Sequence, residues 1–255
     1  MRALLPFLLV GSLAGAGCAA DDRPDAIESR PSTETPTVSP TPTPPGGLTA
    51  TPPPRSSKER VRHLGIDASH HQGTIGWEAV ANDGISFAYL KATEGATFTD
   101  PMFATNARQA ADLGIEVAGY HYFSLCTPGA DQAQHFVSVI EDAPSGWLPP
   151  AVDVELLGSC STPPPREALL AEIKTFLEVV ERHTGQRPVV YLFPDFEEEY
   201  GAAAELSGYR QWVRDLDGRP ERDWWVWQQT DSGSVDGVDG PVDVNILFRR
   251  EVVAR

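Results

Sequence analysis

The feature that most restricts the fold is a regular alternation of short apolar strands with amphipathic helices. The predicted strands are 63–69, 85–91, 116–123, 149–155, 188–193, 209–216, 224–230 and 242–248, and the predicted helices are 77–82, 101–113, 131–142 and 166–183. Strand–helix alternation favours parallel strands. Because the last three predicted strands follow one another with short connections, the pattern predicts a closed α/β barrel with few helices in its last third.

The segment before this alternation is predicted to be an export signal. Residues 1–20 hold a short positive start, an apolar stretch and small residues, as secretory signal peptides do. The end of the segment is also similar to the lipid-attachment motif of bacterial lipoproteins, with Cys18 as the lipidated residue, although Gly15 stands where that motif usually carries Leu. Ordinary secretory cleavage near Ala16 or Ala20 is the alternative.

A linker and one folded domain are predicted after the signal. Residues 21–60 are rich in Pro and Thr and almost free of large apolar side chains, so we expect an extended, disordered linker. Residues 61–255 then form the barrel. We expect an exported protein, either anchored to a membrane and facing the periplasm or cell surface, or secreted. The formal net charge of −16 argues against binding nucleic acid, and it limits membrane contact to the lipid anchor.

Four acidic residues fall on predicted strands, at the ends where such barrels carry their functional groups. Asp153 and Glu155 are separated by one residue, so both side chains point to the same face, with Cα atoms about 6.6 Å apart. Burying two carboxyls together raises one pKa, which suits a glycosidase with one protonated acid and one carboxylate. A solvated strand end is the alternative. Closure of the barrel would bring Asp67, on the first strand, close to Asp243, on the last.

Aromatic side chains on the same strands are candidates for binding sugar rings. They are Tyr120, Tyr122, Tyr191, Trp212 and Trp227. Packing in the core is the alternative for each of them. The histidines and cysteines lack the spacing of a metal site, and His121 reads equally well as a structural residue, so we expect no metal or other cofactor.

Six motifs follow one another along the predicted domain, at 65–73, 91–95, 119–123, 153–155, 227–229 and 240–245. Together they resemble glycoside hydrolase family 25, the Chalaropsis-type lysozymes or N-acetylmuramidases. The resemblance implies a TIM-like (β/α)5(β)3 barrel with a single catalytic domain. It also implies hydrolysis of the β-1,4 bond between N-acetylmuramic acid and N-acetylglucosamine, with peptidoglycan glycan strands as the partner and no cofactor. The protein is expected to act as a monomer.

The resemblance also assigns roles to residues. Glu155 is expected to be the general acid and base. Asp153 is expected to stay ionised and support attack by the substrate's own N-acetyl group, or to attack directly. Asp67 and Asp243 would hold the sugar. The expected substrate contacts are Tyr120, Tyr191, Trp212, Trp227, Gln228 and Asn245. The sequence departs from the family at Ala68, where a larger aliphatic residue is usual, and across residues 194–208.

Two other functions fit parts of the sequence. A non-catalytic, peptidoglycan-binding surface lipoprotein would keep the aromatic residues but would not need the acids, and all four acids are present. A chitinase-like barrel also ends a strand with Asp-x-Glu, but it carries further aspartates where this chain has Leu148 and Ala151. New reducing ends released from walls or from chitin would separate the three functions.

A disulfide is predicted between Cys126 and Cys160. Export places both residues in an oxidising compartment, where paired cysteines usually bridge. They follow the third and fourth predicted strands, and parallel neighbouring strands place those two loops side by side. Two unrelated thiols are the alternative, if the loops diverge.

Overall fold

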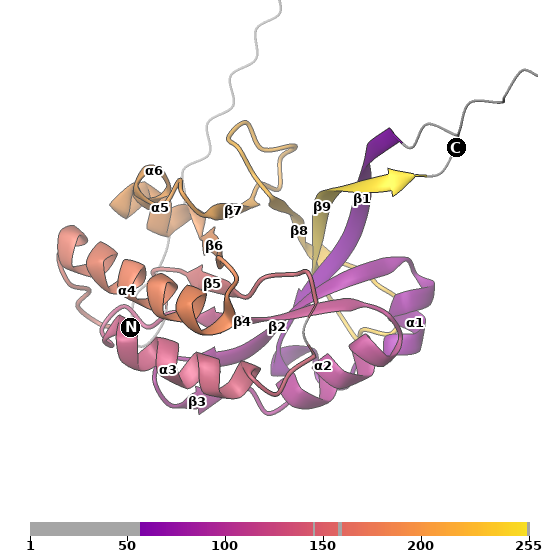
Figure 1. Ribbon diagram of the computed structural model, residues 1–255, viewed down its shortest axis with the longest axis horizontal. Helices are drawn as coiled ribbons and strands as arrows, with labels where there is room; N and C mark the ends of the chain where they lie inside the picture. The colour runs from indigo at the N-terminus through magenta and orange to yellow at the C-terminus, as the bar shows by residue number, and fades with distance from the viewer. Residues whose placement is uncertain (1–56, 145, 158–159, 254–255) are drawn as a thin grey trace, which may run out of the picture. The chain divides into compact units, whose positions relative to one another are not determined.

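Eight strands close into a barrel in the computed structural model, which describes residues 57–144, 146–157 and 160–253 (Figure 1). The strands are β1 (Ser57–Ala68), β2 (Ile85–Glu94), β4 (Glu116–Tyr122), β5 (Ala151–Val154), β6 (Val189–Leu192), β7 (Arg210–Arg214), β8 (Val226–Gly233) and β9 (Val242–Val253). The circle closes because β1 pairs with both β2 and β9. A two-residue strand, β3 (Phe98–Thr99), adds to β2. The predicted TIM-like α/β barrel is confirmed.

Helices cover one part of the barrel and leave another part without cover (Figure 1). They are η1 (His70–Gln72), α1 (Trp77–Asn82), α2 (Phe103–Asp112), α3 (Gly129–Ile140), α4 (Arg166–Thr184), α5 (Pro194–Tyr200) and α6 (Ala202–Glu205). Between β7 and β9 the described chain forms no helix, as the (β/α)5(β)3 order implies. The sequence left residues 194–208 unassigned, and α5 and α6 lie there. No helix of the described chain is long and apolar enough to cross a membrane.

The last strand runs against its neighbours, which the sequence pattern did not indicate. The pairs from β1 through β2 and β4 to β8 are parallel, whereas β9 is antiparallel to both β8 and β1. The carboxyl ends of seven strands therefore meet the amino end of β9, and we call this end of the barrel the mouth. In the β1–β9 register Asp67 lies opposite Asp243, so two of the predicted acids face each other at the mouth.

The barrel begins at Ser57, four residues before the predicted boundary. Residues 57–62 pair with the end of β9, from Ser57 opposite Val253 to Arg62 opposite Phe248. This stretch is mostly polar and lacks the apolar run of a typical strand, so the sequence predicts a linker there. Only its pairing with a segment far along the chain makes it a strand. The predicted signal, Cys18 and the linker before Ser57 lie outside the described residues and stay predictions.

Apolar side chains form two layers that close the barrel below the mouth. The buried face of α4, including Leu169, Ile173 and Phe176, packs in the layer between strands and helices. Phe87, Tyr89 and other large side chains pack together in a second cluster inside the barrel. Because successive strand residues point to opposite faces, each strand supplies both layers. The mouth is therefore a cavity with a packed floor and not a channel.

Candidate active site

A cavity of about 220 Å³ opens at the mouth, and all eight barrel strands contribute to it. Its lining residues are Asp67 and Ser69 at the end of β1, His71 from η1, Lys91 on β2, Tyr120 and Tyr122 on β4, Asp153 and Glu155 at the end of β5, Tyr191 on β6, Trp212 on β7, Gln228 on β8 and Asp243 on β9. The four predicted acids are brought together here from distant parts of the chain. The predicted contacts Tyr120, Tyr191, Trp212 and Gln228 also line the cavity.

One wall carries the pair formed by Asp67 and Asp243. Asn245 Nδ2 donates a hydrogen bond to Asp67 Oδ2 at 2.7 Å, and Gln228 Nε2 donates to the same oxygen at 3.4 Å. Burial raises the pKa of Asp67 well above its usual range, and the charge of Asp243 raises it further. Burial also raises the pKa of Asp243. The two facing carboxyls therefore retain a proton between them more readily than isolated carboxyls do.

A chain of hydrogen bonds behind this wall fixes the position of Asp67. Trp212 Nε1 donates to Asn245 Oδ1 at 2.8 Å, and Tyr191 Oη donates to Gln228 Oε1 at 2.9 Å. Asn245 is fully buried and does not line the cavity. The structure therefore places this predicted substrate contact one step behind the surface, where it positions Asp67.

Trp227 lies away from the cavity, contrary to the prediction that it contacts substrate there. Its neighbour Gln228 points into the mouth, so the alternation of β8 turns Trp227 outward. Its indole Nε1 donates to the carbonyl of Asp215 at 2.8 Å, and its ring centroid lies 5.9 Å from that of Trp224. An aromatic residue on a strand did not by itself indicate which face it would occupy.

The opposite wall carries Asp153 and Glu155. Burial raises the pKa of Asp153 well above its usual range, and the charge of Glu155 raises it further. Burial likewise raises the pKa of Glu155, whereas the hydroxyl of Tyr122, 3.3 Å from Glu155 Oε2, lowers it. Asp153 Oδ1 is buried without a hydrogen-bond partner among the described residues. One hydrogen-bonding position of this wall is therefore unoccupied by protein.

The sequence argument expects a proton on Glu155 and a charge on Asp153. Burial raises the pKa of both carboxyls, so the pair retains a proton more readily than isolated carboxyls do.

Three further cavity residues, Ser69, His71 and Lys91, were not among the predicted site residues. Lys91 is buried, lies 2.6 Å from Glu94 Oε2, and has its ammonium 4.7 Å from the centre of the Tyr122 ring. Its charge lowers the pKa of both Asp153 and Glu155. All three residues lie in the motifs at 65–73 and 91–95, but the motifs did not indicate that these side chains would line the cavity.

His121 is a structural residue and lies outside the cavity. Its two ring nitrogens lie 2.7 Å from Thr93 Oγ1 and 3.1 Å from Gln132 Oε1, and its ring stacks on Phe176 with centroids 4.7 Å apart. Burial lowers its pKa to about 3, so the ring is neutral. Among the described residues, no group of three or more His, Cys, Asp or Glu side chains could hold a metal ion.

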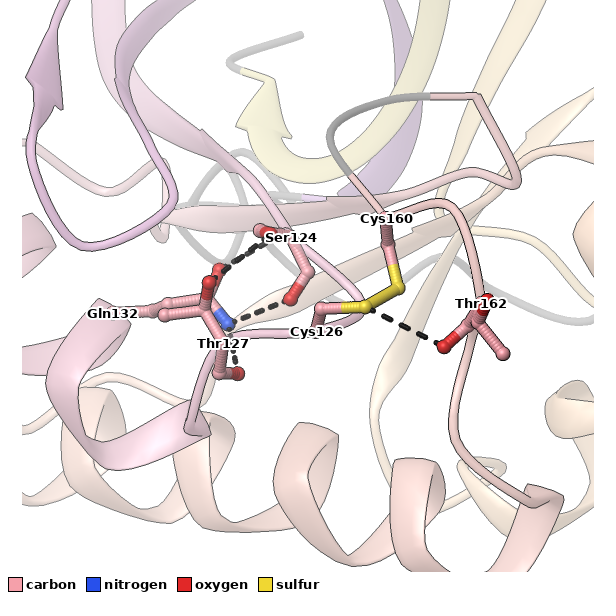
Figure 2. Close-up of a disulfide and its surroundings, with 6 residues drawn as sticks. All are labelled: Ser124, Cys126, Thr127, Gln132, Cys160 and Thr162. Atoms are coloured by element: carbon pink, nitrogen blue, oxygen red, sulfur yellow. Dashed lines mark hydrogen bonds between the residues drawn. A yellow bond between two sulfur atoms is a disulfide. The ribbon is translucent and has the colours of Figure 1, made fainter.

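The predicted disulfide joins Cys126 to Cys160, with their Cα atoms 5.3 Å apart (Figure 2). The two cysteines follow β4 and β5, which pair in parallel, so the prediction of adjacent loops is confirmed. Gln132 Nε2 donates to the carbonyls of Ser124 and Thr127 on the β4 side. On the β5 side, the hydroxyl of Tyr122 donates to the carbonyl of Leu157. The bridge therefore ties Cys160, which follows Glu155 in the chain, to the segment after β4.

Comparisons with known proteins agree with this geometry. Residues 66–238 match the family model of glycosyl hydrolases family 25. The chain is 36% identical over 192 residues to the uncharacterised protein YegX of Escherichia coli K12, covering 72% of this chain and 68% of that protein. It is 31% identical over 202 residues to Lysozyme M1 of Streptomyces globisporus, covering 71% and 66%. A solved family 25 glycosyl hydrolase from Bacillus anthracis superimposes with a TM-score of 0.65 at 30% identity, covering 72% of this chain and 88% of that one.

Proposed function

The chain belongs to glycosyl hydrolases family 25, and from this premise we propose that it is a lysozyme that cleaves bacterial peptidoglycan between N-acetylmuramic acid and N-acetylglucosamine. The observation that carries the proposal is the meeting of four carboxyls from β1, β5 and β9 in one cavity, each with a raised pKa. Likeness to Lysozyme M1 supports the choice of substrate.

Glu155 is the proposed general acid. It lies at the end of β5, half-buried, with its carboxyl open to the cavity. Its proton passes to the glycosidic oxygen as that bond breaks, so that the departing sugar leaves as a neutral alcohol. The resulting carboxylate then takes a proton from the attacking water, which restores the acid.

Asp153 is proposed to direct the substrate's N-acetyl group. Its buried Oδ1 lacks a partner in the described structure, and an acetamido N–H supplies the missing donor. This hydrogen bond favours the charged form of Asp153, so the proton of the pair lies on Glu155 when substrate is bound. The acetamido oxygen can then attack the anomeric carbon and is displaced by water. Direct attack by Asp153, through a covalent sugar intermediate, is the alternative route.

Asp67 and Asp243 are proposed to hold the sugar on the facing wall. Hydrogen bonds from Asn245 and Gln228 fix Asp67, so its position does not depend on substrate. Trp212 and Tyr191 supply aromatic surface beside it. A sugar ring bound against this wall therefore meets a rigid surface, and its glycosidic bond can be placed at Glu155.

Digestion of purified sacculi tests the proposal. Enzyme of this kind releases fragments whose new reducing end is N-acetylmuramic acid, identified by reduction and mass spectrometry. N-acetylglucosamine at the new ends would indicate a different bond, and cleavage of chitin would indicate a different substrate. Binding to walls without new reducing ends would support the non-catalytic wall-binding alternative. The Glu155→Gln variant is the control for contaminating hydrolases.

Export is part of the proposal. The apolar segment at residues 1–20 and the motif ending at Cys18 support a lipid-anchored enzyme facing the wall, with residues 21–56 as its spacer. Mass spectrometry of the mature protein tests this: a lipidated Cys18 at the amino terminus supports the anchor. An unmodified terminus near Ala16 or Ala20 would mean that the enzyme is secreted without an anchor.

A further inference from the structure

A second groove lies at the opposite end of the barrel from the mouth. Its volume is about 440 Å³, and the proposed reaction does not use it. Its lining residues are Ala203, Ala204, Ser207, Tyr209, Arg210, Gln211, Arg222, Asp223, Trp224 and Trp225. Arg210 and Gln211 begin β7, and Trp225 directly precedes β8, so the groove opens where those two parallel strands start. No helix of the described chain lies between β7 and β8 in sequence, and α6 forms one side of the groove through Ala203 and Ala204.

Two polar groups in this groove lack partners. Arg222 is half-buried, and within the described residues its guanidinium makes neither an ion pair nor a hydrogen bond. Partial burial lowers the pKa of Arg222, and the charge of Glu197, which makes no direct ion pair with it, acts in the opposite direction. Gln211 Nε2 donates to the carbonyls of Leu206 and Tyr209, whereas its Oε1 is buried without a described partner. The groove is therefore lined by two arginines without a described ion pair, Arg210 and Arg222, and by one carboxylate, Asp223, so its charged side chains sum to a net positive charge.

Aromatic rings form the wall beside these polar groups. Trp224 and Trp225 are both half-buried, so part of each indole stays accessible in the groove. Neighbouring side chains hold these rings in place: Arg210, which also lines the groove, lies 4.5 Å from the Trp225 ring, and Trp224 packs 5.7 Å from Phe248. Rigid aromatic surface next to hydrogen-bonding groups is the usual composition of a site for a small, partly apolar ligand. Sugar rings have both characters.

We propose that this groove is a second glycan-binding site, which takes an acidic amino sugar of the peptidoglycan strand. A carboxylate of the sugar pairs with Arg222, an N–H or hydroxyl donates to Gln211 Oε1, and the ring lies against Trp224. N-acetylmuramic acid carries all three features where no stem peptide is attached to its lactyl carboxyl, and the stem peptide supplies the carboxylate where one is attached. This inference rests on the proposed function, because it takes the second ligand from the same polymer.

Such a site would offset the electrostatic repulsion between the protein and its polymer. The chain carries a formal net charge of −16, and peptidoglycan carries carboxylates, so the two repel each other overall. A groove with an unpaired arginine allows the enzyme to hold the polymer all the same. A strand bound there is not the strand in the mouth, because the two sites lie at opposite ends of the barrel. In a cross-linked network the second contact raises the local concentration of strands near the mouth.

Binding to walls can be measured without cleavage. The full chain carrying Glu155→Gln is sedimented with purified sacculi from which accessory anionic polymers have been stripped. Adding Arg222→Gln should weaken binding about tenfold, as loss of a charged hydrogen bond does. Arg219→Gln is the matched control: it is an exposed arginine in the same segment, beside Trp224 but outside the groove lining, and should change binding less than about twofold.

A second variant covers the case in which Arg222→Gln perturbs folding. Ala204 is exposed and lines the groove, so Ala204→Glu adds a negative charge there without disturbing the core. It should also weaken binding to sacculi. With Glu155 intact, both variants should cleave short soluble wall fragments at the wild-type rate and sacculi more slowly. If the wild-type enzyme does not cleave soluble fragments, the proposed function is overturned. The binding experiment uses the Glu155→Gln background, so its result does not depend on cleavage.

The inference is overturned if Arg222→Gln and Ala204→Glu bind stripped sacculi as tightly as the Arg219→Gln control does. It is also overturned if their only loss is on vesicles of phosphatidylglycerol and phosphatidylcholine, because the groove would then serve a membrane surface. The inference is overturned as well if the two variants bind more weakly than the control only when accessory wall polymers are left on the sacculi. The groove would then bind those polymers and not the peptidoglycan.

Discussion

The two carboxyl pairs of the mouth are built in opposite ways. Asp67, on the β1–β9 wall, accepts hydrogen bonds from Asn245 and Gln228, and those two residues are themselves held by Trp212 and Tyr191. On the β5 wall, Asp153 Oδ1 has no described partner, and the Tyr122 hydroxyl lies 3.3 Å from Glu155 Oε2. The protein therefore fixes Asp67, whereas the β5 wall leaves hydrogen-bonding capacity for a ligand.

This difference suggests that one wall of the cavity binds the substrate and the other carries out the reaction. A carboxyl held by buried hydrogen bonds, as Asp67 is, changes its protonation state at a high free-energy cost, because the change disturbs that hydrogen-bond network. A pair with an unoccupied acceptor can shift its shared proton when a substrate supplies the missing donor. The chemistry should therefore belong to Asp153 and Glu155.

Replacing Glu155 should have the largest effect. Glu155→Gln keeps the size of the side chain but removes the transferable proton, and general acid catalysis contributes about 10²–10⁴-fold. We expect the release of reducing ends from sacculi to fall by that factor, while the melting temperature and wall binding are retained. Hydrolysis near the wild-type rate would assign the acid to another residue.

Replacing Asp153 should cost about 10²-fold or more, the usual effect of removing one group that stabilises developing charge. In Asp153→Asn the side chain is neutral, so it no longer stabilises the positive charge that develops on the acetamido group during attack. If Asp153 acts only through that group, the intact mass of the Glu155→Gln variant after incubation with substrate should show no bound sugar. A covalent adduct on Asp153 would establish direct attack.

Releasing Asp67 from its hydrogen bonds should affect hydrolysis less and stability more. Asn245→Leu removes the donor to Asp67 and leaves the buried Trp212 N–H without its acceptor, so we expect a loss of about 1–3 kcal/mol from the free energy of unfolding. Trp212→Phe removes only the outer bond of the chain, but it also trims a buried ring. Denaturant unfolding measures both. A larger loss of activity than in Asp153→Asn would reverse the assignment of roles.

The disulfide joins segments that follow β4 and β5, on the Asp153–Glu155 side of the mouth, and not the β1–β9 wall. Its 34-residue separation corresponds to a stabilisation of about 3–4 kcal/mol in the chain-entropy model. Replacing both cysteines by Ser should lower the melting temperature and change hydrolysis little at temperatures well below it. Scanning calorimetry with parallel assays measures this. An unchanged melting temperature would contradict the predicted stabilisation.

The smallest effect is on stability as a function of pH. Raised carboxyl pKa values mean that the folded protein binds protons more tightly than the unfolded chain, so these groups favour folding at low pH. That contribution is lost as the pH rises from the ordinary carboxyl range through the raised values. Asp153→Asn removes a carboxyl that is costly to ionise, so its melting temperature should exceed the wild-type value near neutral pH. The excess should disappear in acid.

The barrel and its acids could be predicted because local patterns carry them. Alternating strand and helix signals predicted the fold, and the two-residue spacing put Asp153 and Glu155 on one face. Barrel closure alone placed Asp67 near Asp243. These predictions need only strand periodicity and the rule that functional groups gather at one end of such a barrel.

The remaining features depend on pairing between distant segments. The direction of β9 and the extension of β1 to Ser57 come from contacts between strands far apart in the chain, which short-range patterns do not encode. The outward face of Trp227 depends on which register β8 adopts, because a shift of one residue exchanges the two faces. Lys91 reads as an ordinary strand residue until the barrel closes around it.

The antiparallel course of β9 has a practical consequence. Because β1 enters the barrel and β9 leaves it at the end away from the mouth, with Ser57 opposite Val253, both ends of the described chain emerge side by side (Figure 1). A fused domain or a solid support joined there faces the back of the catalyst. Either end, or both at once, can therefore serve as an attachment point for immobilising the enzyme. The entrance to the mouth stays clear, whereas the proposed second groove lies at the end that faces the support.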